Sequence, residues 1–260
     1  MRPQVVAHRG ASHENAEHTL RAYKRAIEVG AGALECDVRL TADGHLVCVH
    51  DRDLRRTAAA KGVISTMKLE QLDQLDFASW KNPWAEFDDE APDADPEDNK
   101  VLTLRKLLET VADSGRRVEL AIETKHPTRY GGLVERRLVE LLTDFGWTGE
   151  DSPARVMSFS LTALQRVQRM APQIQKVMLV EKAHHWPVLR RAVNKDWIIG
   201  PGITELRDHP GLGRHLRLAD REIHVWTVNT AEELQICLDL GVTAVITDKP
   251  AYLLELLGAP

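Results

Sequence analysis

The sequence predicts an α/β protein, a TIM-type (β/α)8 barrel with an insertion after the second strand. Three observations lead to this fold class. Short, β-rich apolar runs alternate with longer segments of helical spacing, which indicates a parallel sheet with crossover helices. The strand candidates number about eight, as a closed barrel requires. The 260 residues allow one large α/β domain or two small ones, and no linker divides the chain.

The expected strands, in chain order, are Gln4 to His8, Ala33 to Leu40, Val118 to Glu123, Arg155 to Phe159, Lys176 to Val180, Trp197 to Gly200, Ile223 to Val228 and Ala244 to Asp248. The expected helices are Thr19 to Val29, Leu104 to Asp113, Leu133 to Phe145, Leu161 to Met170, Ala231 to Leu240 and Ala251 to Leu257. Gly30 and Gly115 follow the first two helices, where glycine commonly serves as a C-terminal cap.

The stretch Asp51 to Lys100 interrupts this alternation. It is too long for an ordinary loop between a strand and a helix, and we therefore interpret it as an insertion within a single domain that spans residues 1–260. Its acidic, proline-bearing part, Asp88 to Asp98, is expected to be a solvated loop without a binding role.

Composition limits the classes of partner. The formal net charge is −5, so the protein lacks the large positive field that attracts nucleic acid or anionic lipid. Three widely spaced cysteines argue against a disulfide framework and fit a reducing compartment. No apolar run resembles a secretory signal or approaches the ~18 residues of a membrane span. We expect a cytoplasmic enzyme with a small-molecule substrate, although a mature chain without its signal would look the same. The oligomeric state is not indicated.

Carboxylates at strand ends are the first candidates for chemistry. Strand geometry has period two, so Glu35 and Asp37 point into the barrel while their neighbours face the helices. Buried negative charge needs a cation, and Ca²⁺ or Mg²⁺ prefers oxygen ligands. By the same alternation Glu123 shares a face with Lys125 and supplies a third carboxylate. A buried ion-pair network among Glu35, Asp37, Arg9 and Lys125 explains the acidic pair equally well when it is considered alone.

Two histidines end short β runs near these carboxylates. His8 ends the first strand, and His50 ends the run from Leu46 to His50. One histidine can take a proton from a nucleophile while another gives a proton to a leaving alkoxide, and an unperturbed pKa of about 6.5 suits both roles. Arg9 and Lys125 supply the positive charge that a phosphate needs. Together these groups favour phosphodiester cleavage.

At this point the residues resemble the bacterial type of the glycerophosphodiester phosphodiesterase family. The matching motifs lie in the family's order and cover nearly the whole chain. They are His8-Arg9-Gly10, ALECDVRLTADGHLVCVHD from Ala33 to Asp51, IETK from Ile122 to Lys125, VWTVN from Val225 to Asn229, and ITDKP from Ile246 to Pro250.

The resemblance implies a TIM-type barrel that hydrolyses glycerophosphodiesters to sn-glycerol 3-phosphate and an alcohol. It also implies one divalent metal ion, Ca²⁺, Mg²⁺ or Mn²⁺. By position, Glu35, Asp37 and Glu123 resemble the family's metal ligands. His8 and His50 resemble its acid and base pair.

The substrate contacts follow from the same resemblance. Arg9 and Lys125 resemble the phosphate contacts, and Trp226 resembles the aromatic residue that lines the glycerol end of the pocket. The segment 51–100 resembles the family's insertion, which caps the barrel and helps to form the substrate pocket. Phe159, at a strand end, is a candidate to line the same pocket, with core packing as an equal alternative.

The chain departs from the family pattern in one place. The family usually has Pro-Glu-Asn-Thr after its HRG motif, whereas this chain has Ala16, Glu17, His18 and Thr19. No role follows for His18, and Thr19 is expected to start a helix, so we favour a structural function for this tetrapeptide. Asp248 is expected to anchor the last strand end through hydrogen bonds, and not to bind a metal.

Three other functions agree with parts of the pattern. A related barrel phosphodiesterase could act on phospholipids or lysophospholipids. A catalytically inactive binding module is also consistent with the fold, but it would not need every charged strand-end group. A metal-dependent aldolase or isomerase would not need paired histidines beside two phosphate-seeking cations.

Overall fold

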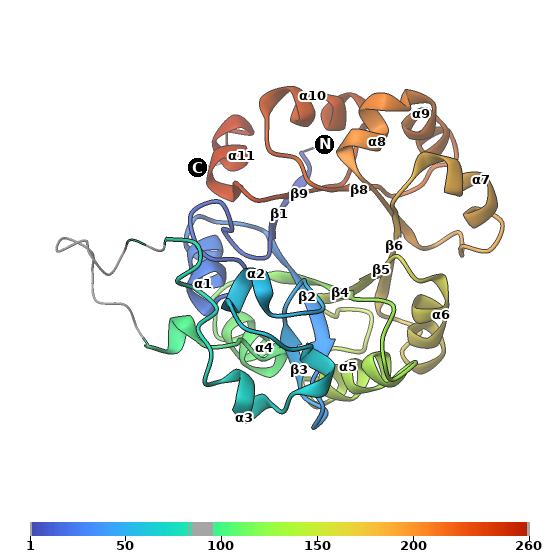
Figure 1. Cartoon of the computed structure of the whole chain (residues 1–260). Helices are drawn as coiled ribbons and strands as arrows, with labels where there is room; N and C mark the ends of the chain where they lie inside the picture. Colours follow the sequence, from blue (N-terminus) through green and yellow to red (C-terminus); the bar gives the residue numbers. More distant parts are fainter. Residues whose placement is uncertain (1, 83, 85–95, 259–260) are drawn as a thin grey trace.

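The computed structural model describes residues 2–82, 84 and 96–258, and its central feature is a ring of parallel strands surrounded by helices (Figure 1). The ring strands are β1 (Gln4–His8), β2 (Ala33–Leu40), β4 (Glu119–Thr124), β5 (Ala154–Ser158), β6 (Gln175–Val180), β7 (Ile198–Pro201), β8 (His224–Val225) and β9 (Ala244–Thr247). Neighbouring strands pair in the order β7-β6-β5-β4-β2-β1-β9-β8, and all of these pairs are parallel.

Two parallel bridges, Ile199 with Ile223 and Gly202 with Trp226, join β7 to β8 and close the ring. The predicted fold class, a TIM-type barrel, is therefore confirmed. Strand β8 is shorter than predicted, because the chain after Val225 forms isolated hydrogen bonds in place of a regular ladder. The Trp226 amide donates to the Pro201 carbonyl, and the Val228 amide donates to the Ile246 carbonyl.

The helices that alternate with the strands are α1 (Leu20–Glu28), α4 (Leu104–Ala112), α5 (Leu133–Asp144), α6 (Leu161–Met170), α10 (Ala231–Leu240) and α11 (Pro250–Leu256). These agree with the predicted segments, and Thr19 is the N-cap of α1 as expected, because its hydroxyl accepts a hydrogen bond from the Ala22 amide. No helix in the described part of the chain is long and apolar enough to cross a membrane.

Between β6 and β8 the chain also forms η4 (Ala183–His185), α7 (Trp186–Leu189), α8 (Ile203–Asp208) and α9 (Pro210–Leu218). Sequence analysis missed α8 and α9. Two glycines in α9 weaken its helical signal. Gly213 packs closely, because a Cβ atom there would lie 2.7 Å from a methyl carbon of Leu240 and would displace that side chain. Tertiary contact therefore overrides local propensity in this helix.

Apolar side chains form two layers around the strands. Residues such as Val6, Ala121 and Ile246 fill the inside of the barrel. A larger core lies between the barrel and the helices, and it includes Leu34 and Cys36, as period-two geometry predicts for β2. The alternate residues of β2 are left to face the barrel interior.

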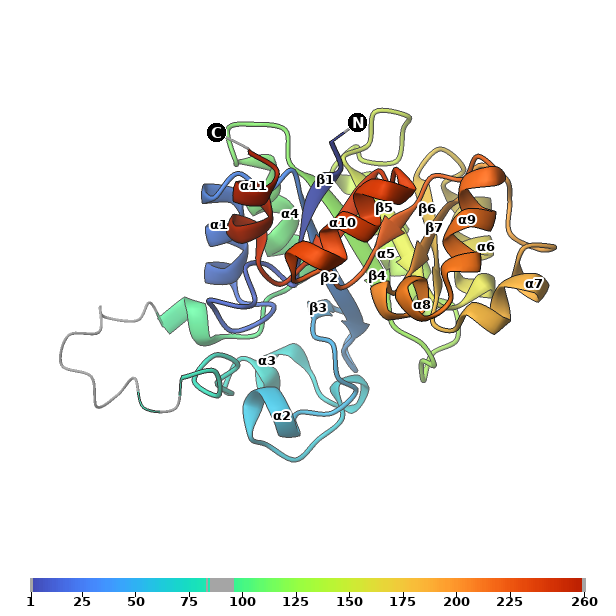
Figure 2. The ribbon, with the colours of Figure 1, turned by 90° about the horizontal axis from the view of Figure 1, so that it is seen from above.

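The segment between β2 and α4 contains β3 (Leu46–Cys48), α2 (Arg55–Ala58), η1 (Ile64–Thr66), α3 (Leu69–Leu72) and η3 (Pro96–Asn99). Strand β3 pairs antiparallel with β2. The segment has a small core of its own, made by Val47, Val49, Leu54, Ile64, Leu72, Phe77 and Val101. Figure 2 shows α2 and α3 beyond one end of the barrel, opposite the N-terminus of β1. Of the acidic stretch Asp88 to Asp98, residues 88–95 lie outside the described residues.

Candidate active site

Three carboxylates meet at the C-terminal ends of β2 and β4. Glu35 and Asp37 alternate along β2, and Asp37 is in register with Glu123 on β4. Each of the three offers a carboxylate oxygen within 4.8 Å of the other two. All three are buried, with at most 8% of the residue exposed. Parallel pairing thus converts two separate sequence motifs into one acidic cluster.

Two cations contact this cluster. Arg9 Nε lies 3.1 Å from Asp37 Oδ2, and its backbone amide donates to Glu35 Oε2 at 3.0 Å. Lys125 Nζ lies 3.0 Å from Asp37 Oδ1 and 2.8 Å from Glu123 Oε1. The ion pairs of the alternative interpretation are therefore present. They leave three carboxylates facing two cations.

The excess negative charge shifts the pKa values of the three carboxyl groups. Burial, together with the charge of Asp37, raises the pKa of Glu35 well above its usual range. The same two causes raise the pKa of Glu123 to about 7. Burial opposes ionisation of Asp37 too, but hydrogen bonding by His18 and the charges of Lys125 and Arg9 hold its pKa well below the usual range. Two of the three carboxyls thus lack enough positive charge to ionise easily.

The cluster fits a hard divalent ion. Its oxygen donors converge, they are shielded from water, and their charge is undercompensated, which are the conditions that such an ion satisfies. Soft thiolate ligands are not available, because Cys36 packs in the core on the other face of β2.

His8 approaches the cluster from β1. Its Nδ1 lies 2.7 Å from Asp248 Oδ1, and its Nε2 lies 4.0 Å from Glu35 Oε2. Asp248 also accepts hydrogen bonds from Ser12 Oγ at 3.0 Å and Asn229 Nδ2 at 2.7 Å. The aspartate does anchor the last strand end, as expected. Its contact with His8 was missed, and it leaves Nε2 as the nitrogen that faces the cluster.

His50 has a similar partner. Its Nδ1 lies 2.8 Å from Asp51 Oδ1, and Arg56 Nε donates to the other oxygen of Asp51 at 2.6 Å. Burial lowers the pKa of His50. The guanidinium of Arg39 donates twice to the His50 carbonyl, at 3.0 and 2.7 Å, and so holds the backbone of this histidine against β2.

His18, which sequence analysis left without a role, lies in the cluster. It is 5% exposed, with a positive φ of 60°, and its Nε2 lies 3.0 Å from Asp37 Oδ2. Its Nδ1 lies 2.8 Å from Tyr23 Oη. Burial lowers the pKa of His18. In the neutral ring, Nε2–H donates to Asp37, while Nδ1 and the Glu35 carbonyl, 3.1 Å from Tyr23 Oη, compete for the single hydroxyl proton of Tyr23. His18 thus positions a carboxylate without adding charge.

Two aromatic residues lie on another part of the barrel mouth. The rings of Phe159, after β5, and Trp226, after β8, meet edge to face with centroids 5.6 Å apart. Trp226 Nε1 donates to the Gly200 carbonyl at 2.8 Å, which fixes the indole. Phe159 is 39% exposed and is therefore not a core residue. The structure brings these two predicted pocket residues together.

Known proteins resemble this chain over nearly its whole length. The model of the glycerophosphoryl diester phosphodiesterase family matches residues 8–252. A protein of Mycobacterium tuberculosis named a probable glycerophosphodiester phosphodiesterase 1 is 41% identical over 252 residues, which cover 95% of this chain and 90% of that protein. A glycerophosphodiester phosphodiesterase of Bacillus subtilis is 32% identical over 254 residues, covering 95% and 83% of the two chains.

Two solved structures superpose on nearly the whole chain. An Oleispira antarctica phosphodiesterase, determined in complex with the product sn-glycerol-3-phosphate, superposes with a TM-score of 0.81 at 25% identity and covers 99% of this chain and 97% of that one. A glycerophosphodiester phosphodiesterase of Agrobacterium tumefaciens superposes with a TM-score of 0.70 at 26% identity, over 96% and 97% of the chains.

Proposed function

The chain belongs to the glycerophosphoryl diester phosphodiesterase family and is an enzyme of this class, and from this premise we propose a metal-dependent acid and base mechanism. The reaction is the hydrolysis of a glycerophosphodiester to sn-glycerol 3-phosphate and an alcohol. One observation carries the proposal: three converging buried carboxylates lie beside a histidine whose Nδ1 contacts an aspartate, with a second such pair nearby in the sequence.

Glu35, Asp37 and Glu123 would hold one divalent ion, Ca²⁺, Mg²⁺ or Mn²⁺. When bound, the ion supplies Lewis-acid stabilisation of negative charge on the phosphoryl oxygens. The support is the donor set itself, which has three carboxylates with oxygens that converge within 4.8 Å.

Arg9 and Lys125 would bind the phosphate. Arg9 Nη1 donates to Glu17 at 3.1 Å, Nε lies 3.1 Å from Asp37 as an ion pair without a hydrogen bond, and Nη2 has no partner among the described residues. Lys125 uses two contacts, both to cluster carboxylates, and an ammonium has three donors. Lys125 therefore keeps one donor for a phosphoryl oxygen, and Arg9 keeps at least the two of Nη2, while the cluster holds both cations in place.

His8 and His50 would transfer the protons. The carboxylate at Nδ1 favours the tautomer with Nδ1–H, which leaves Nε2 as the exchanging atom in both rings. One ring accepts a proton from the attacking group, and the other donates a proton to the oxygen of the departing alcohol as its bond to phosphorus breaks. Asp248 and Asp51 act as positioning residues.

Trp226, with Phe159 against it, would line the glycerol end of the substrate. We further propose that residues 1–260 act as one catalytic domain. Within this domain, the segment 51–100 would form the wall of the pocket on the side of the leaving alcohol. The placement of α2 and α3 beyond the mouth of the barrel supports this assignment (Figure 2).

The histidine assignment is tested by His8→Ala and His50→Ala, assayed by glycerol 3-phosphate release from glycerophosphocholine. We expect each substitution to lower kcat by about 10²–10⁴. His209→Ala is the matched control, because this histidine is exposed, and it should leave kcat unchanged. Near-normal turnover in both site variants would refute the assignment.

The metal assignment has a test that does not depend on activity. The melting temperature of chelator-treated protein should rise when Ca²⁺, Mg²⁺ or Mn²⁺ is added, because a ligand that binds only the folded state stabilises it. Glu123→Gln should remove the rise, whereas Glu140→Gln, on the exposed face of α5, should retain it. A full rise in Glu123→Gln would contradict the ligand set.

A further inference from the structure

A pocket lies beside the acidic cluster, and of its charged lining residues the proposed mechanism uses only Lys125. We call it the basic pocket, and it has a volume of about 440 Å³, within the range of about 300–1,000 Å³ for small-molecule sites. Its walls come from β2, the loop after β4 and the inserted segment. Its charged lining consists of Arg39, Arg52, Lys125 and Arg129, and no acidic residue lines it among those described.

The arginines of the basic pocket lack ionic partners within residues 2–82, 84 and 96–258. Arg52 and Arg129 form no ion pair and donate no hydrogen bond there, and Arg39 uses Nε and Nη2 on a carbonyl while Nη1 is free. By contrast, Arg55 and Arg56 of the same segment pair with Asp53 and with Glu17 and Asp51. Three arginines that line one pocket without an ion pair indicate an anionic ligand.

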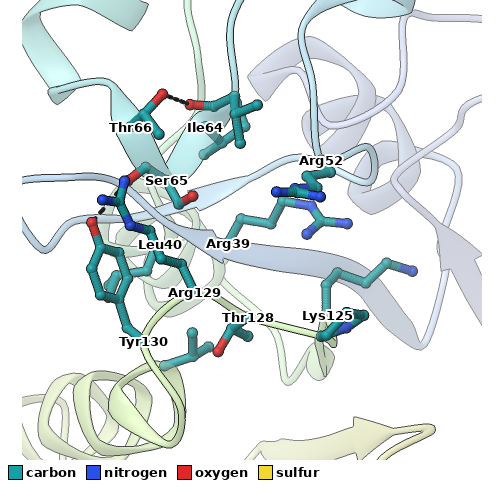
Figure 3. A pocket seen from close by; sticks show the side chains of 13 residues that line it. Arg39, Leu40, Arg52, Ile64, Ser65, Thr66, Lys125, Thr128, Arg129 and Tyr130 are labelled. Carbon is teal, nitrogen blue, oxygen red and sulfur yellow. Dashed lines mark hydrogen bonds between the residues drawn. The ribbon is translucent and has the colours of Figure 1, made fainter.

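The pocket has a defined wall on the side away from the cluster. Tyr130 Oη donates to the Ser65 carbonyl at 2.9 Å, which joins the loop after β4 to η1. The Arg129 guanidinium lies over the Tyr130 ring, 5.6 Å from its centroid. Figure 3 shows the ends of Arg39 and Arg52 side by side, with Lys125 on the same side and Arg129 on the opposite wall. Cations therefore border the pocket from two sides.

Lys125 connects the basic pocket to the site of chemistry, because its ammonium contacts Asp37 and Glu123 and its side chain lines the pocket. Trp226 follows β8, and β8 lies across the barrel from β2 (Figure 1). A diester whose phosphate sits on Lys125 and whose glycerol contacts Trp226 therefore directs its other ester, the leaving alcohol, toward Arg39 and Arg52.

We propose that the basic pocket binds the leaving alcohol and selects alcohols that carry a phosphate of their own. The inference rests on the proposed function and names its substrate class. Water adds to the phosphorus of the diester, the bond from phosphorus to the alcohol oxygen breaks, and the alcohol leaves as a phosphate monoester after it takes up a proton. Arginine forks suit phosphate oxygens, whereas choline or ethanolamine would place a positive charge among three arginines.

The test compares kcat/KM for three substrates at one fixed ionic strength. They are glycerophosphocholine, glycerophosphoglycerol, and glycerophosphoglycerol with a phosphate on its leaving glycerol. We expect the phosphorylated substrate to exceed glycerophosphoglycerol by at least about tenfold, as one or two charge-assisted hydrogen bonds provide. Glycerophosphocholine should be the poorest of the three.

Arg52→Gln separates the pocket from the chemistry. It should lower kcat/KM by about tenfold for the phosphorylated substrate and by less than about twofold for glycerophosphoglycerol. Arg55→Gln, three residues away with an 81% exposed side chain, is the matched control and should change neither value. Both side chains lie at the surface, so unchanged melting temperatures will show that the variants fold.

The outcomes are distinguishable. If the wild-type enzyme has equal kcat/KM for all three substrates, or if Arg52→Gln lowers all three equally, the inference is wrong while the proposed function stands. If none of the three is hydrolysed with Ca²⁺, Mg²⁺ or Mn²⁺ present, the proposed function fails and the inference fails with it.

Discussion

Replacing Asp248 by asparagine should disable His8 without removing it. The carboxylate lies 2.7 Å from His8 Nδ1, and although partial burial opposes ionisation, this hydrogen bond and those from Asn229 and Ser12 hold the pKa of Asp248 well below its usual value. An amide in its place can present NH₂ to Nδ1, which favours the tautomer with the proton on Nε2. The exchanging nitrogen then has the wrong protonation state.

The expected magnitude follows from two losses. A hydrogen bond to a charged group contributes about 1.5–3 kcal/mol. The wrong tautomer adds a comparable cost, as the equivalent change does in hydrolases with an Asp-His pair. A total of about 3–5 kcal/mol corresponds to a decrease in kcat of about 10²–10⁴. KM should stay within about twofold of the wild-type value, because Asp248 does not contact the proposed substrate position.

The assay is steady-state release of glycerol 3-phosphate, with melting temperatures measured in parallel. Glu222→Gln is the matched control, because Glu222 contacts His224 at 3.2 Å at the opposite end of the barrel, and its kcat should be unchanged. If Asp248→Asn keeps kcat within about threefold of wild type while His8→Ala is inactive, the positioning role of Asp248 is wrong.

Three further substitutions test the residues that support the site, through their effect on the stability of the fold. Burial opposes ionisation of Glu17, but contacts with Arg56, Arg9 and His18 lower its pKa from 4.5 to about 2. The ionised carboxylate therefore contributes at most about 3 kcal/mol of stability, which should be complete above pH 5 and lost as the pH falls toward 2. The free energies of urea unfolding of wild type and Glu17→Gln should converge at acid pH. His18→Ala should cost about 2–4 kcal/mol, because it removes a buried hydrogen bond from both Asp37 and Tyr23, whereas His18→Asn should cost less, since asparagine tolerates the positive φ; equal losses in urea unfolding would argue against this explanation. Gly10→Ala should cost about 3 kcal/mol or more by the same measurement, because φ is +84° and a Cβ atom would lie 2.6 Å from the Ala22 carbonyl carbon; a loss below about 1 kcal/mol would contradict the packing argument.

The barrel was predictable because its strands carry strong local patterns. Strand β2 was predicted with its observed bounds, since its alternation of buried apolar and acidic residues has period two from Ala33 to Leu40. Helix α9 was not predictable, because Gly211 and Gly213 both weaken its helical signal, and only Gly213 packs closely against another side chain. Local sequence thus identifies an element only where its own residues favour it.

The candidate site also has a part that the sequence predicts and a part that it does not. The acidic and histidine motifs are local, and parallel pairing brings their strand ends together, so their proximity could be predicted from the sequence. The contact of His8 with Asp248 joins residues 240 positions apart, and no local pattern signals it. His18 was hidden for another reason. Its ring contacts Asp37 from an irregular loop, where the His18 backbone has a positive φ. The direction of a side chain in such a loop cannot be predicted from the spacing of apolar residues.

The residues that flank the inserted segment 51–100 lie next to each other. The Cys48 amide donates to the Leu102 carbonyl at 2.8 Å, and Val47 forms an antiparallel bridge with Thr103. A segment that leaves and rejoins the barrel at adjacent points can change length at little entropic cost. This segment, with its own small core and Arg52, can therefore be replaced while the barrel stays the same. Such a replacement would change the preferred leaving alcohol and leave the proposed catalytic residues at the strand ends unaltered.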